Sequence, residues 1–151
     1  MKALVVYDSA YGNTEEIAKA IGGALGGQVL VRRANEVSPS DLASIELLIV
    51  GSPTQAGKPT QAIQDFLKSL PDIRGVSVAA FDSRMSMWLA RVFGYAAQKI
   101  VKSLKARGGT LVAPPQAFYV DAKEGPLADG EAERAAYWAR TTSGIRASGK
   151  D

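Results

Sequence analysis

The sequence predicts an α/β protein with one doubly wound parallel sheet and helices on both of its faces. Three observations support this fold class. Apolar runs alternate with segments of helical spacing five times along the chain. Several of these runs are apolar at nearly every position, which is typical of parallel strands buried on both faces. The 151 residues, 46% of them hydrophobic, suffice for one ordinary domain with a substantial core.

The first third of the chain predicts two strands and two helices. Residues 2–7 are predicted as a buried strand, because they are nearly all apolar and turn residues follow them. Apolar side chains then recur at helical spacing over residues 17–25, and Gly26-Gly27 ends that helix. Residues 28–32 predict the second strand, and residues 39–42 predict only a short helix.

The middle of the chain repeats the same alternation with longer elements. Residues 47–50 predict a third buried strand. Residues 63–70 place apolar side chains on one face of a helix, and Pro71 ends it. Residues 76–81 predict the fourth strand, and a long helix with inward apolar residues over 89–104 follows. Each strand–helix–strand unit predicts a right-handed crossover between parallel strands.

The last part of the chain predicts a weaker fifth strand and a final helix. Residues 110–120 form the strand, and Pro114-Pro115 interrupts it, so we expect a sheet edge there. Residues 131–140 predict the last helix, and the polar residues 141–151 are expected to fray. No linker or repeat divides the chain, so residues 1–151 are predicted to form a single domain.

The composition excludes several kinds of chemistry. The chain has no cysteine and no histidine, so disulfides, thiolate catalysis, iron–sulfur ligation and a Ser-His-Asp triad are impossible. We expect no metal site and no catalytic side chains. A net charge of +3 is too small to indicate nucleic-acid binding. No apolar run reaches the ~18 residues of a membrane span, and no signal peptide is indicated, so a cytoplasmic location is predicted.

A ligand site is expected at the carboxyl ends of the strands, as in other open α/β sheets. Three polar loops, at residues 8–14, 52–58 and 82–88, reach this edge. The first loop precedes a helix, whose unpaired N–H groups and dipole favour an anion. Gly12 permits a tight turn, so the loop suits a phosphate group, although an ordinary strand–helix turn capped by Thr14 is the alternative.

Other phosphate-binding families do not match this loop. It has neither the Gly-x-x-x-x-Gly-Lys pattern of nucleotide triphosphatases nor the Gly-x-Gly-x-x-Gly pattern of dinucleotide sites. A response-regulator receiver needs an aspartate where Gly51-Ser52 ends the third strand, and a small tyrosine phosphatase needs a cysteine.

The loops resemble those of the flavodoxin family. The stretch Ser-Ala-Tyr-Gly-Asn-Thr at residues 9–14 resembles that family's phosphate loop, and residues 51–57 and 81–84 resemble its second and third FMN-binding loops. The resemblance spans essentially the whole chain. It implies the short-chain form, with a three-layer α/β/α architecture and a five-stranded sheet in the order 2-1-3-4-5.

The resemblance also implies the cofactor and its contacts. FMN is the implied cofactor, and its phosphate is assigned to Ser9, Ala10, Tyr11, Gly12, Asn13 and Thr14. One side of the isoalloxazine is assigned to Ser52, Pro53, Thr54, Gln55, Ala56 and Gly57. Its pyrimidine edge is assigned to Asp82, Ser83 and Arg84. The 52–58 loop lacks the aromatic ring common in the family, so Trp88 either stacks on the flavin or covers the start of the long helix.

Electron transfer between a reductase and an acceptor is the function that this resemblance implies. A small FMN-dependent NAD(P)H or quinone reductase, and a flavin-free binding module, are the alternatives. The stretch from residue 82 to residue 107 is basic, and Asp82 is its single acid; its cations are Arg84, Arg91, Lys99, Lys102, Lys105 and Arg107. This charge forms either a solvated helix face or a docking surface for an acidic redox partner. Neither nucleic acid nor a membrane is expected as a partner.

Overall fold

The computed structural model of the protein describes residues 1–85 and 95–148. Its strands are β1 (Lys2–Tyr7), β2 (Gln28–Arg33), β3 (Leu47–Pro53), β4 (Ser77–Met85), β5 (Thr110–Leu111) and β6 (Gln116–Val120). Its helices are α1 (Asn13–Ala24), α2 (Pro39–Leu42), α3 (Gln61–Ser69), α5 (Ala96–Ala106) and α6 (Glu131–Ser148), with a 3-10 turn η1 at Ala34–Glu36.

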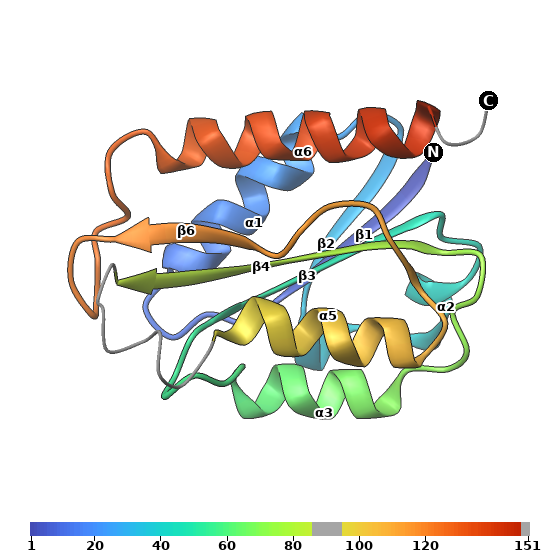
Figure 1. The fold of residues 1–151 in the computed structure, drawn as a ribbon, viewed down its shortest axis with the longest axis horizontal. Helices are drawn as coiled ribbons and strands as arrows, with labels where there is room; N and C mark the ends of the chain where they lie inside the picture. The colour runs from blue at the N-terminus through green and yellow to red at the C-terminus, as the bar shows by residue number, and fades with distance from the viewer. Residues whose placement is uncertain (86–94, 149–151) are drawn as a thin grey trace.

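The strands form one parallel sheet between two helical layers (Figure 1). The order β2-β1-β3-β4-β5 confirms the predicted fold class and strand order. β5 and β6 both pair with β4, because Pro114 and Pro115 divide the predicted fifth strand into two pieces. The first piece pairs near Val78 and the second begins opposite Phe81.

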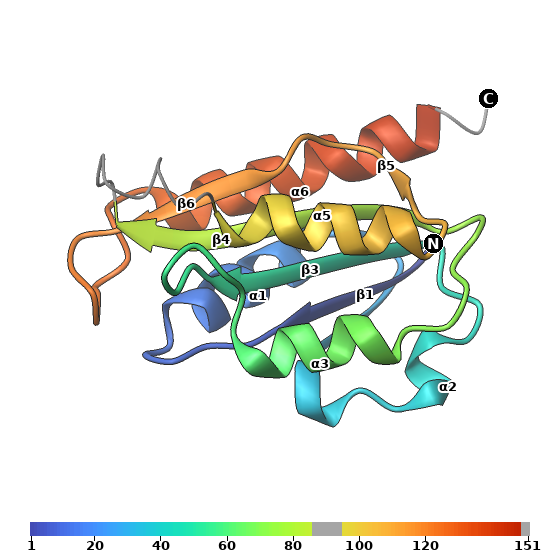
Figure 2. The ribbon, with the colours of Figure 1, turned by 60° about the horizontal axis from the view of Figure 1, so that its bottom comes forward.

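Each face of the sheet carries its own hydrophobic core. Leu4 and Val6 of β1 belong to the core that contains residues of α3 and α5, while Val5 and Tyr7 belong to the core that contains residues of α1 and α6. This alternation follows from the two-residue period of a strand. Figures 1 and 2 show the corresponding layers, with α1 and α6 on one side and α3 and α5 on the other. The apolar runs are therefore buried on both faces, as predicted.

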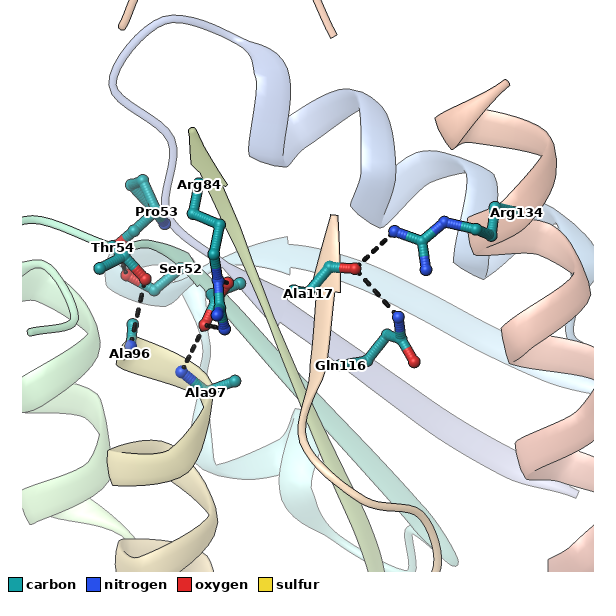
Figure 3. Close-up of polar contacts among 10 residues, drawn as sticks. Ser52, Pro53, Thr54, Arg84, Ala96, Ala97, Gln116, Ala117 and Arg134 are labelled. Atoms are coloured by element: carbon teal, nitrogen blue, oxygen red, sulfur yellow. Dashed lines mark hydrogen bonds and ion pairs between the residues drawn. The ribbon is translucent and has the colours of Figure 1, made fainter. Parts of the chain in front are cut away.

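Side chains from the start of α6 cover the outer edge of β6. The backbone N–H of Tyr119 donates to a carboxylate oxygen of Glu131 at 2.7 Å. Arg134 Nη2 donates to the carbonyl oxygen of Ala117 at 2.6 Å (Figure 3). Edge strands otherwise expose such groups to pairing with other chains, so these two contacts both fix β6 and protect it.

Some element boundaries differ from the prediction. β4 continues to Met85, so residues 82–84 are strand rather than loop. α6 continues to Ser148 rather than ending at Arg140, and residues expected to fray are helical. Its extension carries the buried Thr142, which the polar sequence does not reveal. α5 is described from Ala96, so the predicted helical residues 89–94 lie outside the described residues.

An aromatic cluster supports the carboxyl end of the sheet. The rings of Phe81, Phe118 and Trp138 contact one another edge to face, with centroids 6.0–6.2 Å apart. Gly51 makes room for this cluster, because a Cβ at that position would lie 2.0 Å from the Phe81 ring. The glycine that ends the apolar part of β3 is thus required by packing. Among the described helices, none is long and apolar enough to cross a membrane.

Candidate functional site

A cavity of about 500 Å³ lies at the carboxyl edge of the sheet. This volume is in the usual range for a small-molecule site. The cavity brings together the ends of β1, β3, β4 and β6. The described residues that line it are Ser9, Ala10, Tyr11, Asn13, Thr14, Pro53, Thr54, Gln55, Ala56, Ser83, Arg84, Met85, Val120 and Lys123. Residues from all three predicted loops therefore meet in one place.

The first wall of the cavity is the turn from β1 into α1. Gly12 caps the helix with a left-handed φ of 93°, and its N–H donates to Ser9 Oγ at 3.0 Å. The first intrahelical bond runs from Glu16 N–H to the Gly12 carbonyl oxygen at 3.0 Å. The N–H groups of the first three helical residues precede this bond, and the helix dipole adds partial positive charge beside them. This geometry suits an anionic group such as phosphate.

A buried hydrogen bond joins this wall to the fourth strand. Thr14 Oγ1 and Ser83 Oγ lie 2.7 Å apart, and both side chains are almost fully buried. Both residues also line the cavity. Their bond uses one of the two hydroxyl hydrogens, so the other can be donated to a ligand.

Arg33 supports the outer side of the same turn. Its guanidinium lies 3.6 Å from an Asp8 carboxylate oxygen and 3.2 Å from one of Glu15. The hydrogen bond from Lys19 is the largest cause that lowers the pKa of Glu15. Burial, followed by the Glu15 charge, raises the pKa of Tyr7, over whose ring Arg33 lies. Asp8 and Glu15, which lie in and beside the phosphate wall, are therefore paired with cations, which limits their repulsion of an anion.

Ser52, predicted to contact the cofactor, holds the second loop in place. Its hydroxyl donates to the carbonyl oxygen of Pro53 at 2.9 Å and accepts from Thr60 N–H at 3.0 Å. The side chain is fully buried and lies outside the described lining of the cavity. Thr54, which does line the cavity, accepts from Ala96 N–H at 3.1 Å (Figure 3).

The tip of the second loop is a tight two-residue turn. Gln55 and Lys58 exchange backbone hydrogen bonds of 2.8 and 2.9 Å. Ala56 and Gly57 between them both adopt positive φ, at 49° and 79°. Two such residues match the turn that joins closely paired strands, and glycine at the second position lowers its cost. Ala56 faces the cavity, whereas Gly57 is buried and lies outside its described lining.

Asp82 and Arg84 form a buried ion pair rather than two independent ligands. Arg84 donates to both carboxylate oxygens of Asp82, at 2.7 and 2.6 Å, and its guanidinium lies over the Tyr95 ring. Asp82 also accepts from Ala97 N–H at 3.0 Å (Figure 3). Asp82 is fully buried and lies outside the described cavity lining, and its bond to Ala97 anchors the start of α5. Arg84 does line the cavity, with its charge compensated.

Sequence reasoning missed the wall that follows β6. Val120 and Lys123 line the cavity from a hairpin in which Val120 bridges Leu127. Gly125 of the same segment approaches Asn13 so closely that a Cβ would lie 2.7 Å from its side-chain oxygen. Ligands of open α/β sheets bind at the carboxyl ends of the strands, and this rule also applies to the last strand. The rule could therefore have predicted that residues following β6 line the site. Trp88, for which stacking on the flavin and covering the start of the long helix are the two alternatives, lies outside the described residues.

This fold and this cavity define a protein of the doubly wound α/β class with a ligand site at the carboxyl ends of its strands. The family model described as flavodoxin matches residues 5–138, so the chain belongs to the flavodoxin family. Members of this family bind FMN and carry electrons, so FMN is the cofactor of this chain. No curated protein sequence matches the chain significantly.

Several solved structures share this fold. A flavodoxin from the domain Archaea is 24% identical, with a TM-score of 0.80, over 97% of this chain and 99% of its own. Oxidised flavodoxin 1 from Bacillus cereus is 23% identical, with a TM-score of 0.78, over 94% and 97%. Rubredoxin oxygen:oxidoreductase from Desulfovibrio gigas is 18% identical, with a TM-score of 0.78, over 97% of this chain and 36% of its own. At these identities the likeness shows the fold alone.

The chemistry of the cavity fits FMN. Hydroxyl, amide and helix N–H donors gather on the wall of residues 9–14, as a terminal phosphate requires. Pro53, Met85 and Val120 supply apolar surface elsewhere in the lining, as a flat aromatic ring system requires. The two kinds of surface lie in one cavity, so the polar and apolar parts of one ligand are both accommodated.

Proposed function

We propose that the protein holds FMN in this cavity and shuttles electrons between a reductase and an acceptor protein. The carrying observation is the single cavity that joins a helix N-terminus and the Thr14–Ser83 hydroxyl pair to an apolar wall. FMN supplies the redox chemistry, and the protein supplies binding, orientation and electrostatics.

In this proposal the residues divide into binding and supporting roles. The wall of residues 9–14 binds the phosphate through its N–H and hydroxyl donors. Pro53, Thr54, Gln55 and Ala56 line the ring system on the side of the second loop. Arg84, held by Asp82, presents a guanidinium of fixed orientation with its charge already balanced. The Asp82–Arg84 pair therefore adds little net charge to the cavity that would hold the cofactor.

The two described loops after β1 and β3 are short, which favours a carrier over a reductase with its own substrate. The turn at residues 55–58 closes within two residues, and β1 passes into α1 over residues 8–12. A nicotinamide or quinone pocket above the flavin needs more surface than such loops provide.

Spectroscopy and a coupled assay test this proposal. The purified protein is expected to show flavin absorption, and the released flavin should be FMN. The photoreduced protein should reduce cytochrome c when the two are mixed. It should oxidise NADPH only after a flavin reductase is added. Oxidation of NADPH with a quinone by the protein alone would identify an enzyme instead, and a colourless protein that ignores FMN would exclude both functions.

A further inference from the structure

A second cavity of about 460 Å³ lies between α3 and α5, which run side by side on one face of the sheet (Figure 2). Its lining includes four cations and no acidic side chain among the described residues. These cations are Lys58, Lys68, Lys99 and Arg107. Pro59 and Leu67 supply apolar surface in the same lining. We refer to this cavity as the basic groove.

Helical spacing and two hydrogen bonds shape the groove. Lys99 and Arg107 lie eight residues apart on α5 and at its end, so they project from a similar side of the helix. Arg107 Nη2 crosses to the carbonyl oxygen of Lys68 at the end of α3, at 2.9 Å. Gln64 Nε2 donates to the carbonyl oxygen of Pro59 at 2.8 Å. These bonds fix the two helices and the loop as the walls of one groove.

The positive charge of the groove is not neutralised within the described part of the chain. Lys58, Lys68 and Lys99 form no ion pair with any described residue. Arg84, by contrast, is fully paired with Asp82. An external anionic ligand is the remaining source of counter-charge apart from solvent ions.

The spacing of the cations selects the kind of anion. Eight residues along α5 correspond to ~12 Å, so the charges lie along a line instead of converging on one point. A single phosphate contacts only part of such a line. An extended peptide advances ~3.3 Å per residue, so a segment of about four residues spans it. Pro59 and Leu67 are largely buried, and the small apolar area that they add to the lining suits the aliphatic part of such a segment.

We propose that the basic groove binds an extended acidic segment of a redox partner protein. The groove begins beside the candidate FMN site, because Lys58 closes the turn whose Gln55 and Ala56 line that cavity. A partner segment bound along α3 and α5 therefore has one end close to the rim of the cofactor site. This inference rests on the proposed function for its partner, but the groove itself is separate from the FMN cavity.

The structure also changes which residues make up the predicted basic surface. The sequence pointed to one continuous basic stretch from residue 82 to residue 107. In the structure Arg84 faces the cofactor cavity and Lys102 lies outside the described groove lining. Lys58 and Lys68, which precede that stretch, complete the groove instead. Arg91 lies outside the described residues.

A binding assay with charge-reversed variants tests the groove. The FMN-loaded protein is titrated into a short fluorescein-labelled peptide of alternating Glu and Gly, and fluorescence anisotropy is recorded at low salt. The test variant combines Lys68→Glu with Lys99→Glu. Its matched control combines Lys102→Glu with Arg140→Glu, which changes the net charge equally at exposed positions outside the groove. We expect about tenfold weaker binding for the test variant and less than a twofold change for the control.

Three outcomes would overturn the proposal. Equal weakening in both variants would show attraction by net charge alone. No binding of the peptide to the parent protein would show that the groove takes no acidic segment. Tighter binding of an oligothymidine than of the peptide, with the same loss in the test variant, would assign the groove to nucleic acid. Flavin content and far-UV circular dichroism are measured for every variant, so a failure of FMN binding is recognised separately from a failure of the groove.

Discussion

The hydroxyl oxygens of Thr14 and Ser83 lie 2.7 Å apart, although 69 residues separate them in the chain. This contact ties the first turn of α1 to the end of β4 inside the lining of the candidate FMN site. The contact holds α1 and β4 at a fixed separation beside the wall of residues 9–14, whose donors are proposed to bind the phosphate. The pair is accordingly the part of the site whose alteration should affect the cofactor most selectively.

Replacing Thr14 by alanine should weaken FMN binding about ten- to a hundredfold. The substitution removes a hydroxyl donor to a charged phosphate, and such a hydrogen bond contributes about 1.5–3 kcal/mol. Riboflavin lacks the phosphate, so its affinity should change little. Thr14→Ser keeps the hydroxyl and serves as the control. The measurement is a fluorescence titration of each apoprotein with both flavins; parallel losses for FMN and riboflavin would contradict a phosphate contact at Thr14.

Replacing Arg84 by glutamine should destabilise the fold by about 3 kcal/mol, because Asp82 would remain buried without its cation. Asp82→Asn combined with Arg84→Gln removes both charges, so the double variant should recover much of this loss. Urea unfolding of the parent, both single variants and the double variant gives the coupling energy. A coupling near zero would show that the pair does not act as a unit.

The arrangement of the strands was predictable because it depends on local pattern. Runs such as residues 2–7 and 47–50 are apolar at both odd and even positions. The structure buries the two sets of alternate residues in separate cores on opposite faces of the sheet. The parallel order then places the loops after β1, β3 and β4 at one edge, where their residues do line a common cavity. Pro114-Pro115 correctly indicated a break in the last strand.

The roles of individual polar residues were less predictable because they depend on partners distant in sequence. Asp82 is predicted as a cofactor contact, and the sequence did not show that its carboxylate accepts hydrogen bonds from Ala97 N–H and the Arg84 guanidinium. The hydroxyl oxygen of Ser52 likewise accepts a hydrogen bond from Thr60 N–H. Lys123 reaches the cavity only because its hairpin folds back at the end of β6. None of these contacts has a signature at fixed sequence spacing.

Glu131 should make stability depend on pH in the acid range. Its hydrogen bonds from Arg134, followed by the one from Tyr119 N–H, lower the pKa of this carboxyl below the ordinary value of 4.5. A carboxyl whose pKa is lowered by folding stabilises the protein above its ordinary pKa, and this contribution is lost as the pH falls through the folded pKa. Glu131→Gln should therefore lower the free energy of unfolding by about 1–2 kcal/mol at neutral pH.

Urea unfolding at a series of pH values checks this expectation. The difference between the parent protein and Glu131→Gln should shrink as the pH falls below about 4. Glu133→Gln, at an exposed position in the same helical turn, is the control and should change the free energy of unfolding little. A gap between parent and Glu131→Gln that stays constant down to acid pH would show that the Glu131 charge does not contribute.

Two adjacent glycines of α1 should respond in opposite directions to alanine. Gly23 is exposed, and a Cβ there would meet no atom within 4 Å, so Gly23→Ala should stabilise the helix by about 0.5–1 kcal/mol. At Gly22 a Cβ would lie 2.4 Å from Val31 Cγ2 on β2. Val31 is β-branched and has few alternative rotamers, so the helix or strand must shift, at a cost of about 1–3 kcal/mol. Gly22→Ala should therefore lower the melting temperature while Gly23→Ala raises it. Adding Val31→Ala to Gly22→Ala removes the obstructing methyl group and should return part of the loss. If Gly22→Ala stabilised the protein as much as Gly23→Ala, the close packing of α1 on β2 would not constrain this position.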